Sequence, residues 1–321
     1  MIKYILRRIL QMLMTLFLIV TILFLLLQLT PGSPFNNPKI TPVMREQMEE
    51  KYGLNEPVIV QYGIYISKLV RGDLGESMSI VQNYPVLDMV VKPMKVTVLL
   101  GAIALVFGSL IGIVMGAIAA LNKNKFWDHF NTVVAVLGIS VPAFVVAMLL
   151  LILQRSLNFI PIVYTPVDPV LGITFLDSLV SLTLPVLALS FGVIASISRY
   201  IRTELVEVYN SDFILLARSK GLNKKQVFTK HAFRNALVPI VTIMGPMVVG
   251  LITGSVVVEV FFGVPGLSNL LIKSINVKDT FVTLGCELMY SLLFVTVMLL
   301  VDIAYGFIDP RIRLTGGKNG E

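Results

Sequence analysis

Charged residues, histidines and cysteines are all scarce in this sequence. Charged residues make up 14% of the 321 positions, whereas a soluble globular domain has about 25%. The one cysteine, Cys286, cannot form an internal disulfide, and its apolar neighbours indicate a small buried side chain rather than a reactive thiol. The two histidines, His129 and His231, stand far apart, so they form no metal-ligand cluster. These shortages argue against a soluble enzyme and against a metal site.

Apolar residues are abundant instead, at 56% of the chain with a mean hydropathy of +0.85. A helix needs about 20 apolar residues to cross the hydrocarbon core of a membrane. We predict an all-α integral membrane protein with six transmembrane helices, at residues 9–29, 96–120, 132–153, 179–197, 236–258 and 281–303. Prolines fall inside the third, fourth and fifth stretches, and we keep these predictions because membrane helices tolerate proline.

The first stretch follows Lys3, Arg7 and Arg8, as the apolar part of a signal peptide would. Its apolar run exceeds the about 7–15 residues of a signal peptide, and no A-x-A-like site follows it, so we predict an uncleaved helix. Lysine and arginine in short loops mark the cytoplasmic side. Sixteen of them lie in the termini and connections on one side, against three in the short connections opposite. We therefore expect both termini in the cytoplasm, and the net charge of +7 requires no nucleic acid as a partner.

This topology divides the chain into an N-terminal transmembrane helix at 1–29, an extracytoplasmic segment at 30–95, a membrane core at 96–313 and a cytoplasmic tail at 314–321. In the extracytoplasmic segment, Thr41 is the predicted N-cap of a helix that ends near Gly53, and a second helix runs from Pro57 to Gly72. The residues alone allow two interpretations of this segment: a solvated loop without a task, or a contact surface.

The connection between the fourth and fifth stretches, at 204–235, contains a short basic hairpin. We predict a helix capped by Asp212 that ends at Gly221, where a left-handed conformation turns the chain. Asn223 and Gln226 have capping-box spacing and begin a second helix. The spacing predicts an apolar face ringed by basic residues: the apolar residues are Phe213, Leu216, Ala217 and Leu222, and the basic ones are Arg218, Lys220, Lys224 and Lys225.

This hairpin has three interpretations. It could lie on anionic lipid headgroups as a basic amphipathic element, read DNA as a helix-turn-helix, or insert its apolar face into a groove on a cytoplasmic partner. Attachment to the bilayer at both ends argues against DNA. Chemistry alone leaves the lipid and the partner interpretations open.

Glycines repeat every four positions in two of the predicted spans. They are Gly108, Gly112 and Gly116 in the second span and Gly250 and Gly254 in the fifth. Small residues at this spacing let helix backbones approach closely. Packing within the chain and packing between subunits both explain the pattern.

Motifs for catalysis and for energy coupling are missing. The chain has no G-x-x-x-x-G-K-[ST] loop for nucleotide phosphates, no H-E-x-x-H and no G-x-S-x-G. The ionisable residues at span level are Glu259, Glu287 and Asp302, which form no relay for a proton- or sodium-coupled carrier. We expect Glu259 and Asp302 to anchor helix ends, while Glu287 has no evident partner in the sequence. We predict no catalytic, cofactor or metal residue, so any energy for active transport must come from another chain.

Several segments of the chain together resemble one known family. The segment Asp212-Phe213-Ile214-Leu215-Leu216-Ala217-Arg218-Ser219-Lys220-Gly221-Leu222 is continued by residues 231–239. The others are Pro31-Gly32-Ser33-Pro34, Tyr52-Gly53-Leu54, Gly72-Asp73-Leu74-Gly75, Val256-Val257-Val258-Glu259, Pro265-Gly266-Leu267 and Asp309-Pro310-Arg311-Ile312-Arg313. They resemble the binding-protein-dependent permeases of ATP-binding-cassette (ABC) importers, and more narrowly the peptide/nickel branch of OppB/DppB type. Leu215-Leu216-Ala217 stands where the general signature has Glu-Ala-Ala, and Gly221 keeps the place of its glycine.

The resemblance implies a type I ABC importer fold with its core at 96–313, in the cytoplasmic membrane of a bacterium. It implies as partners a homologous second permease, two ATPase subunits that carry ATP and magnesium, and an extracytoplasmic peptide-binding protein, with membrane lipid around the spans. The hairpin around Gly221 would be the coupling helix that docks into an ATPase, which favours the partner interpretation over the lipid one. The spans would open alternately to the two sides of the membrane.

Peptide import is therefore the leading hypothesis, with oligopeptides preferred on overall likeness and dipeptides or nickel as alternatives within the family. A secondary carrier and a membrane scaffold that transports nothing are the hypotheses from other classes. A neighbouring gene for a chain with a nucleotide-binding loop would favour the importer. Uptake driven by an ion gradient without ATP would favour the carrier.

Overall fold

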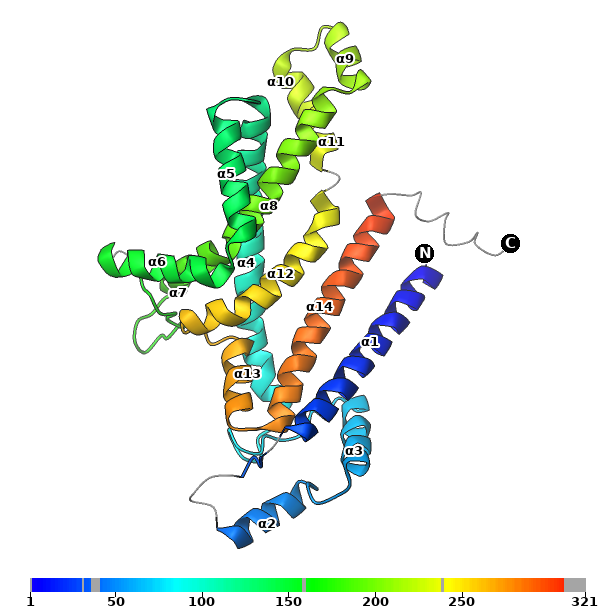
Figure 1. Ribbon diagram of the computed structural model, residues 1–321, viewed down its shortest axis with the longest axis vertical. Coiled ribbons are helices and arrows are strands. Elements are labelled where there is room, and N and C mark those ends of the chain that lie inside the picture. The colour runs from blue at the N-terminus through cyan, green and yellow to red at the C-terminus, as the bar shows by residue number, and fades with distance from the viewer. Residues whose placement is uncertain (1, 31, 36–40, 158–159, 238–239, 309–321) are drawn as a thin grey trace. The chain divides into compact units, whose positions relative to one another are not determined.

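The computed structural model describes residues 2–30, 32–35, 41–157, 160–237 and 240–308, and every regular element in these ranges is a helix (Figure 1). The elements are α1 (Ile2–Leu29), α2 (Pro42–Lys51), α3 (Val58–Val70), α4 (Val86–Leu121), α5 (Phe126–Ser140), α6 (Ala143–Leu157), α7 (Phe175–Ser181), α8 (Thr183–Tyr209), α9 (Asp212–Ser219), α10 (Lys224–Gln226), the π-helix η1 (Val227–Ala232), α11 (Phe233–Leu237), α12 (Ile240–Phe261), α13 (Leu267–Asn276) and α14 (Thr280–Ile308). The prediction of an all-α protein is confirmed. The described residues form two compact units, one from Leu99–Gly263 with Val297–Ile308, the other from Ile2–Val98 with Val264–Thr296.

Within the described residues, five helices are long and apolar enough to cross a membrane: α1, α4, α8, α12 and α14. The third predicted span is not one continuous helix. The helix breaks after Ser140, and the chain bends by 108° between α5 and α6. Pro142 lies in this break, where it has no N–H group to continue the hydrogen bonding of α5. If the bent pair counts as one span, the structure has six crossings, which matches the predicted number. The expected continuous helix at 132–153 is wrong.

Helix α8 is the centre of the first unit. Its most apolar stretch is 67% buried, against 29% or less in the other spans, and α5, α6 and α12 pack around it. Helix α4 approaches α8 closely through its glycines. A Cβ atom at Gly108, Gly112 or Gly116 would lie 2.8, 2.9 or 2.5 Å from the nearest atom of α8. The glycine repeat of the second span thus packs within this chain.

An ion pair holds α5 against α8. The Arg202 guanidinium donates two hydrogen bonds to the carboxylate of Asp128, both at 2.9 Å, and Asp128 is buried. The backbone N–H of Asn124 donates to the same carboxylate at 2.9 Å. A buried carboxylate needs such partners to offset the loss of water. Asp128 therefore fixes both the α5–α8 contact and the turn that joins α4 to α5.

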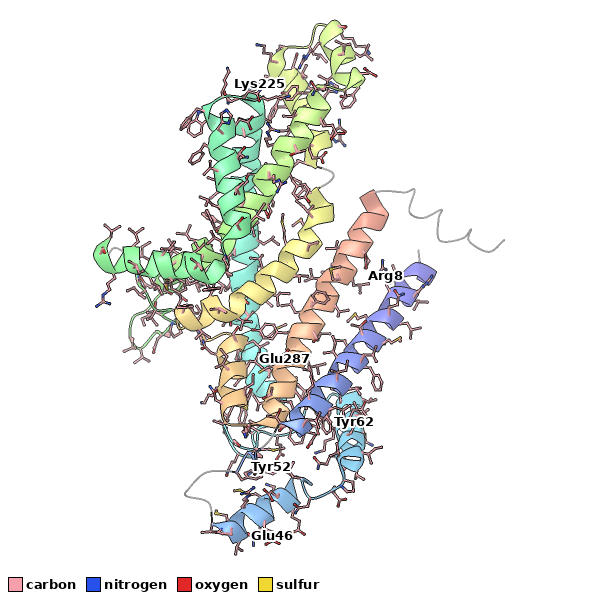
Figure 2. All side chains as sticks on the ribbon, in the orientation of Figure 1. Arg8, Glu46, Tyr52, Tyr62, Lys225 and Glu287 are labelled. Carbon is pink, nitrogen blue, oxygen red and sulfur yellow. The ribbon has the colours of Figure 1, made fainter. Side chains whose placement is uncertain are left out.

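Aromatic packing joins α3 to the membrane helices of the second unit. The ring of Tyr65 stacks on Phe24 of α1 and on Phe281 of α14, with centroid distances of 5.7 and 5.9 Å. The hydroxyl of Tyr62, also on α3 (Figure 2), shares a 2.6 Å hydrogen bond with Thr21. Helix α3 is therefore packed against α1 and α14, which argues against a solvated loop for this part of the segment at 30–95.

Local signals set the helix boundaries in this segment as predicted. The Thr41 hydroxyl accepts a hydrogen bond from the N–H of Met44 at 3.3 Å and caps α2. Gly53 and Gly72 follow α2 and α3 with φ of +68° and +80°, a conformation that favours glycine.

Helix α13 was not predicted. The N–H of Leu267 at its start donates to the Thr97 hydroxyl at 2.9 Å.

Candidate functional site: the hairpin between α8 and α12

The hairpin between α8 and α12 begins with α9 and turns at Gly221 (Figure 1). Ser211 is the N-cap of α9, one residue before the predicted Asp212. At the end of α9, the N–H of Leu222 donates to the carbonyl oxygen of Ala217 at 3.3 Å, and Gly221 has φ of +78°. This is the Schellman motif, in which a left-handed glycine satisfies the last carbonyls of a helix. The predicted left-handed turn is confirmed.

Asn223 starts the second half of the hairpin. Its side-chain oxygen accepts from the N–H of Gln226 at 2.9 Å, while the side-chain oxygen of Gln226 accepts from the N–H of Asn223 at 3.0 Å. This reciprocal pair is the predicted capping box. The chain continues through α10 into η1, whose Val227 and Ala232 are buried. Hydrogen bonds therefore fix the turn and the start of its second half.

Helix α9 exposes three large apolar side chains. Phe213, Leu215 and Leu216 are 44%, 64% and 56% exposed, and we call these three residues the hairpin patch. Ile214 and Ala217 face the other way and are buried, at 0% and 4% exposure. The predicted apolar face is therefore corrected: Ala217 packs inside the hairpin, and Leu215 belongs to the exposed side.

Helical spacing alone could not have found Leu215. The spacing groups positions 213, 216 and 217 on one side of the helix, but it does not say which stripe the rest of the chain covers. In the structure η1 packs against α9. The residues of α9 that are buried are Ile214 and Ala217. The sequence carries no signal that singles out Leu215 as exposed, because the covered stripe of α9 is set by the tertiary contact with η1.

Polar groups surround the hairpin patch. Asp212, Arg218 and Lys220 are exposed, and Leu222 is half-buried. The Arg218 guanidinium lies 5.7 Å from the centre of the Tyr209 ring, within range of a cation–π interaction. An exposed apolar patch with a polar rim is typical of a site that another protein covers.

A second feature of the first unit is a cavity of about 460 Å³ at the break between α5 and α6. Helices α8 and α12 complete its walls, and Gly138, Gly192 and Gly250 are among the lining residues. None of the described lining residues is Lys, Arg, Asp or Glu. A Cβ atom at Gly250 would meet no heavy atom within 4 Å. Irregular backbone at membrane depth is tolerated where it lines such a cavity or is buried in protein.

The remaining predicted residues have mixed outcomes. Cys286 is buried, as predicted. Glu259 is 0% exposed, so the expectation that it anchors a helix end at the membrane surface is wrong. Glu287 lies in α14 (Figure 2), and both Glu287 and Asp302 are half-buried. Pro31, Pro239, the motif at 309–313 and the tail at 314–321 lie outside the described residues.

The apolar helices and the exposed hairpin define a multi-pass membrane protein with the features of a transporter subunit. Residues 112–314 match the family described as binding-protein-dependent transport system inner membrane component, and residues 1–101 match the N-terminal family of the same systems. The chain belongs to the family of binding-protein-dependent transport system inner membrane components. This confirms the resemblance seen in the sequence motifs.

Named relatives are similar over almost the entire chain. A dipeptide transport system permease protein, DppB, of Lactococcus lactis subsp. cremoris (strain MG1363) is 41% identical over 98% of this chain and all of the relative. The DppB of Bacillus subtilis (strain 168) is 38% identical over 97% of this chain and 98% of the relative. An oligopeptide transport system permease protein, OppB, of Salmonella typhimurium (strain LT2) is 38% identical over 98% of this chain and all of the relative.

Proposed function

We propose that this chain is the permease subunit of an ATP-driven importer of short peptides. The relatives named for dipeptide and for oligopeptide transport support peptides as the cargo class. Oligopeptides are the preferred length, on overall likeness, and dipeptides or nickel are the alternatives. The family and the length of the match support the permease role.

The hairpin patch is the observation that carries the coupling role. Phe213, Leu215 and Leu216 stand exposed on a short helix whose C-terminal end is closed by hydrogen bonds. Each would lose contact with water if a groove on an ATPase subunit covered it, and this burial stabilises association. ATP binding and hydrolysis with magnesium would occur on two such subunits. Movement of the hairpin would then pass to α8, which precedes it directly in the chain.

The other proposed partners follow from the same arrangement. A homologous second permease would complete the transport path, to which the glycine-lined cavity at the α5–α6 break would contribute. The segment at 30–95 would face an extracytoplasmic peptide-binding protein. Both termini would lie on the cytoplasmic side of a bacterial membrane, because the basic residues of the short connections gather there.

The cargo and the partners are tested together by purification. A complex isolated through a tag on this chain should contain a second permease and two ATPase subunits, and its binding protein should carry peptides that mass spectrometry identifies. Nickel on the binding protein would instead support the alternative cargo. Recovery of this chain without ATPase subunits from a membrane in which they are present would contradict the proposal and favour a carrier or a scaffold.

A further inference from the structure

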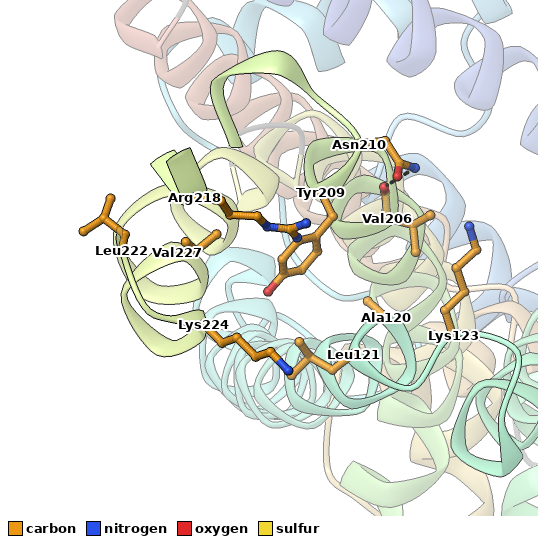
Figure 3. Close-up of a pocket in the computed structure, with 10 residues that line it drawn as sticks. All are labelled: Ala120, Leu121, Lys123, Val206, Tyr209, Asn210, Arg218, Leu222, Lys224 and Val227. Atoms are coloured by element: carbon orange, nitrogen blue, oxygen red, sulfur yellow. Dashed lines mark hydrogen bonds between the residues drawn. The ribbon is translucent and has the colours of Figure 1, made fainter. Parts of the chain in front are cut away.

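A cavity of about 490 Å³ lies at the base of the hairpin (Figure 3). Its walls come from the C-terminal ends of α4 and α8, from the turn after α4, and from the residues on either side of Gly221. Its volume falls within the about 300–1,000 Å³ that is typical of ligand sites. Apolar side chains, including Leu121, Val206 and Val227, form part of the lining.

The charged groups of this cavity all have the same sign. Lys123, Arg218 and Lys224 contribute to the lining, and no carboxylate is among the described lining residues. None of these three cations forms an ion pair within the part of the chain that the structure describes. In the view of Figure 3, the ring of Tyr209 lies between Arg218 and Lys224. Positive charge around a cavity that holds no carboxylate to balance it attracts an anion.

Hydrogen bonds hold the backbone on both sides of the cavity. Lys123 precedes Asn124, whose N–H is bound by the Asp128 carboxylate, and Arg202 ties that carboxylate to α8. Lys224 follows Asn223, the first member of the capping box. The positions that carry the two lysines are therefore fixed before any ligand binds, which lowers the entropic cost of binding.

We propose that this cavity binds the phosphate of an anionic phospholipid headgroup. The positive charge of the lining matches a phosphate, and the apolar lining matches the glycerol backbone and the start of the acyl chains, which a free phosphate lacks. The cavity lies at the C-terminal ends of α4 and α8, two helices that are long and apolar enough to cross a membrane. A headgroup bound there would join the hairpin to the turn after α4. Transport would then be sensitive to the charge of the lipid. Only this effect on transport, and not the lipid binding itself, rests on the proposed function.

The test compares two double variants of the full-length chain in detergent. Lys123→Gln/Lys224→Gln removes two lining charges. Lys125→Gln/Lys225→Gln removes the same charge from the neighbouring positions, which do not line the cavity. Native mass spectrometry measures the binding of phosphatidylglycerol and of phosphatidylcholine. All four lysines are exposed, so both variants should fold, and elution volume and thermal midpoint check this.

We expect the wild type to prefer phosphatidylglycerol, and the lining variant to bind it about twenty-five-fold more weakly, which is about fivefold for each lysine. The control variant should retain wild-type affinity, and arginine at positions 123 and 224 should restore it. Equal loss in both double variants would assign the effect to diffuse surface charge and overturn the proposal. Absence of lipid preference in the wild type, or displacement of the lipid by equimolar inorganic phosphate, would overturn it as well.

Discussion

A single added charge in the hairpin patch should abolish docking of the ATPase while leaving the hairpin folded. The change is Leu216→Asp. Leu216 is 56% exposed and lies on the outer side of α9, away from the buried Ile214 and Ala217. The substitution therefore adds a charge in water in the free permease. In the docked state the same carboxylate would enter the contact without a partner.

The magnitude follows from the exposed area. Burying a whole leucine side chain is worth about 1.5–3 kcal/mol. Since 56% of Leu216 remains to be covered, docking gains about 0.8–1.7 kcal/mol from it, or about 4- to 17-fold in affinity. Leu216→Ala should lose part of this gain. Leu216→Asp should lose all of it and add the several kcal/mol that an unpaired buried charge costs.

The assay is equilibrium binding of the ATPase subunits to detergent-solubilised permease, where no bilayer contributes. Thr229→Asp is the control, because it adds the same charge on an exposed residue of η1 outside the patch. We expect weakened binding for Leu216→Ala, none for Leu216→Asp, and wild-type binding for Thr229→Asp. Wild-type affinity of the Leu216→Asp permease would refute the docking role of the patch.

Further predictions concern folding and topology. Ala217→Asp places a charge in the buried side of α9, so it should unfold the hairpin and speed its cleavage by trypsin; an unchanged digest would contradict the packing described. Gly116→Ala brings a Cβ atom to 2.5 Å from a backbone oxygen of α8 and should cost about 1–3 kcal/mol, whereas Gly101→Ala, with open space around it, should leave the thermal midpoint unchanged or higher. In a cysteine-free background, an impermeant thiol reagent should label cysteine at Gln47 from outside and at Asn223 only after permeabilisation; external labelling at Asn223 would reverse the orientation. Deleting α2 should impair peptide uptake with the permease–ATPase complex intact, and normal uptake would leave this helix without a task.

Sequence reasoning was most accurate where structure depends on neighbouring residues. The cap at Thr41, the capping box at Asn223 and the left-handed turn at Gly221 were all predicted, because each is a hydrogen-bonding or steric choice made within five residues. The outward side of α9 depends on the position of η1. That position is set by tertiary packing and not by neighbouring residues in the sequence. The sequence therefore placed Ala217 with the exposed residues and overlooked Leu215.

The membrane spans show the same difference between features that local sequence determines and features that tertiary packing determines. Length and apolar composition located the membrane helices, since crossing a bilayer requires about 20 apolar residues. The effect of Pro142 was not predictable from composition, because proline is tolerated in membrane helices when neighbouring groups satisfy the freed carbonyls. At this position the chain bends by 108° instead. The burial of Glu259 was missed for a related reason, because closeness to a helix end suggested contact with water.

Uptake of labelled peptide by proteoliposomes tests the central claim most directly. The vesicles would contain this chain, its second permease and the ATPase subunits, with peptide-loaded binding protein outside and ATP with magnesium on the ATPase side. We predict peptide accumulation that requires ATP and the binding protein, persists when ionophores collapse ion gradients, and is lost with Leu216→Asp. Accumulation driven by an ion gradient without ATP, or equal ATP-driven uptake by vesicles that lack this chain, would contradict it.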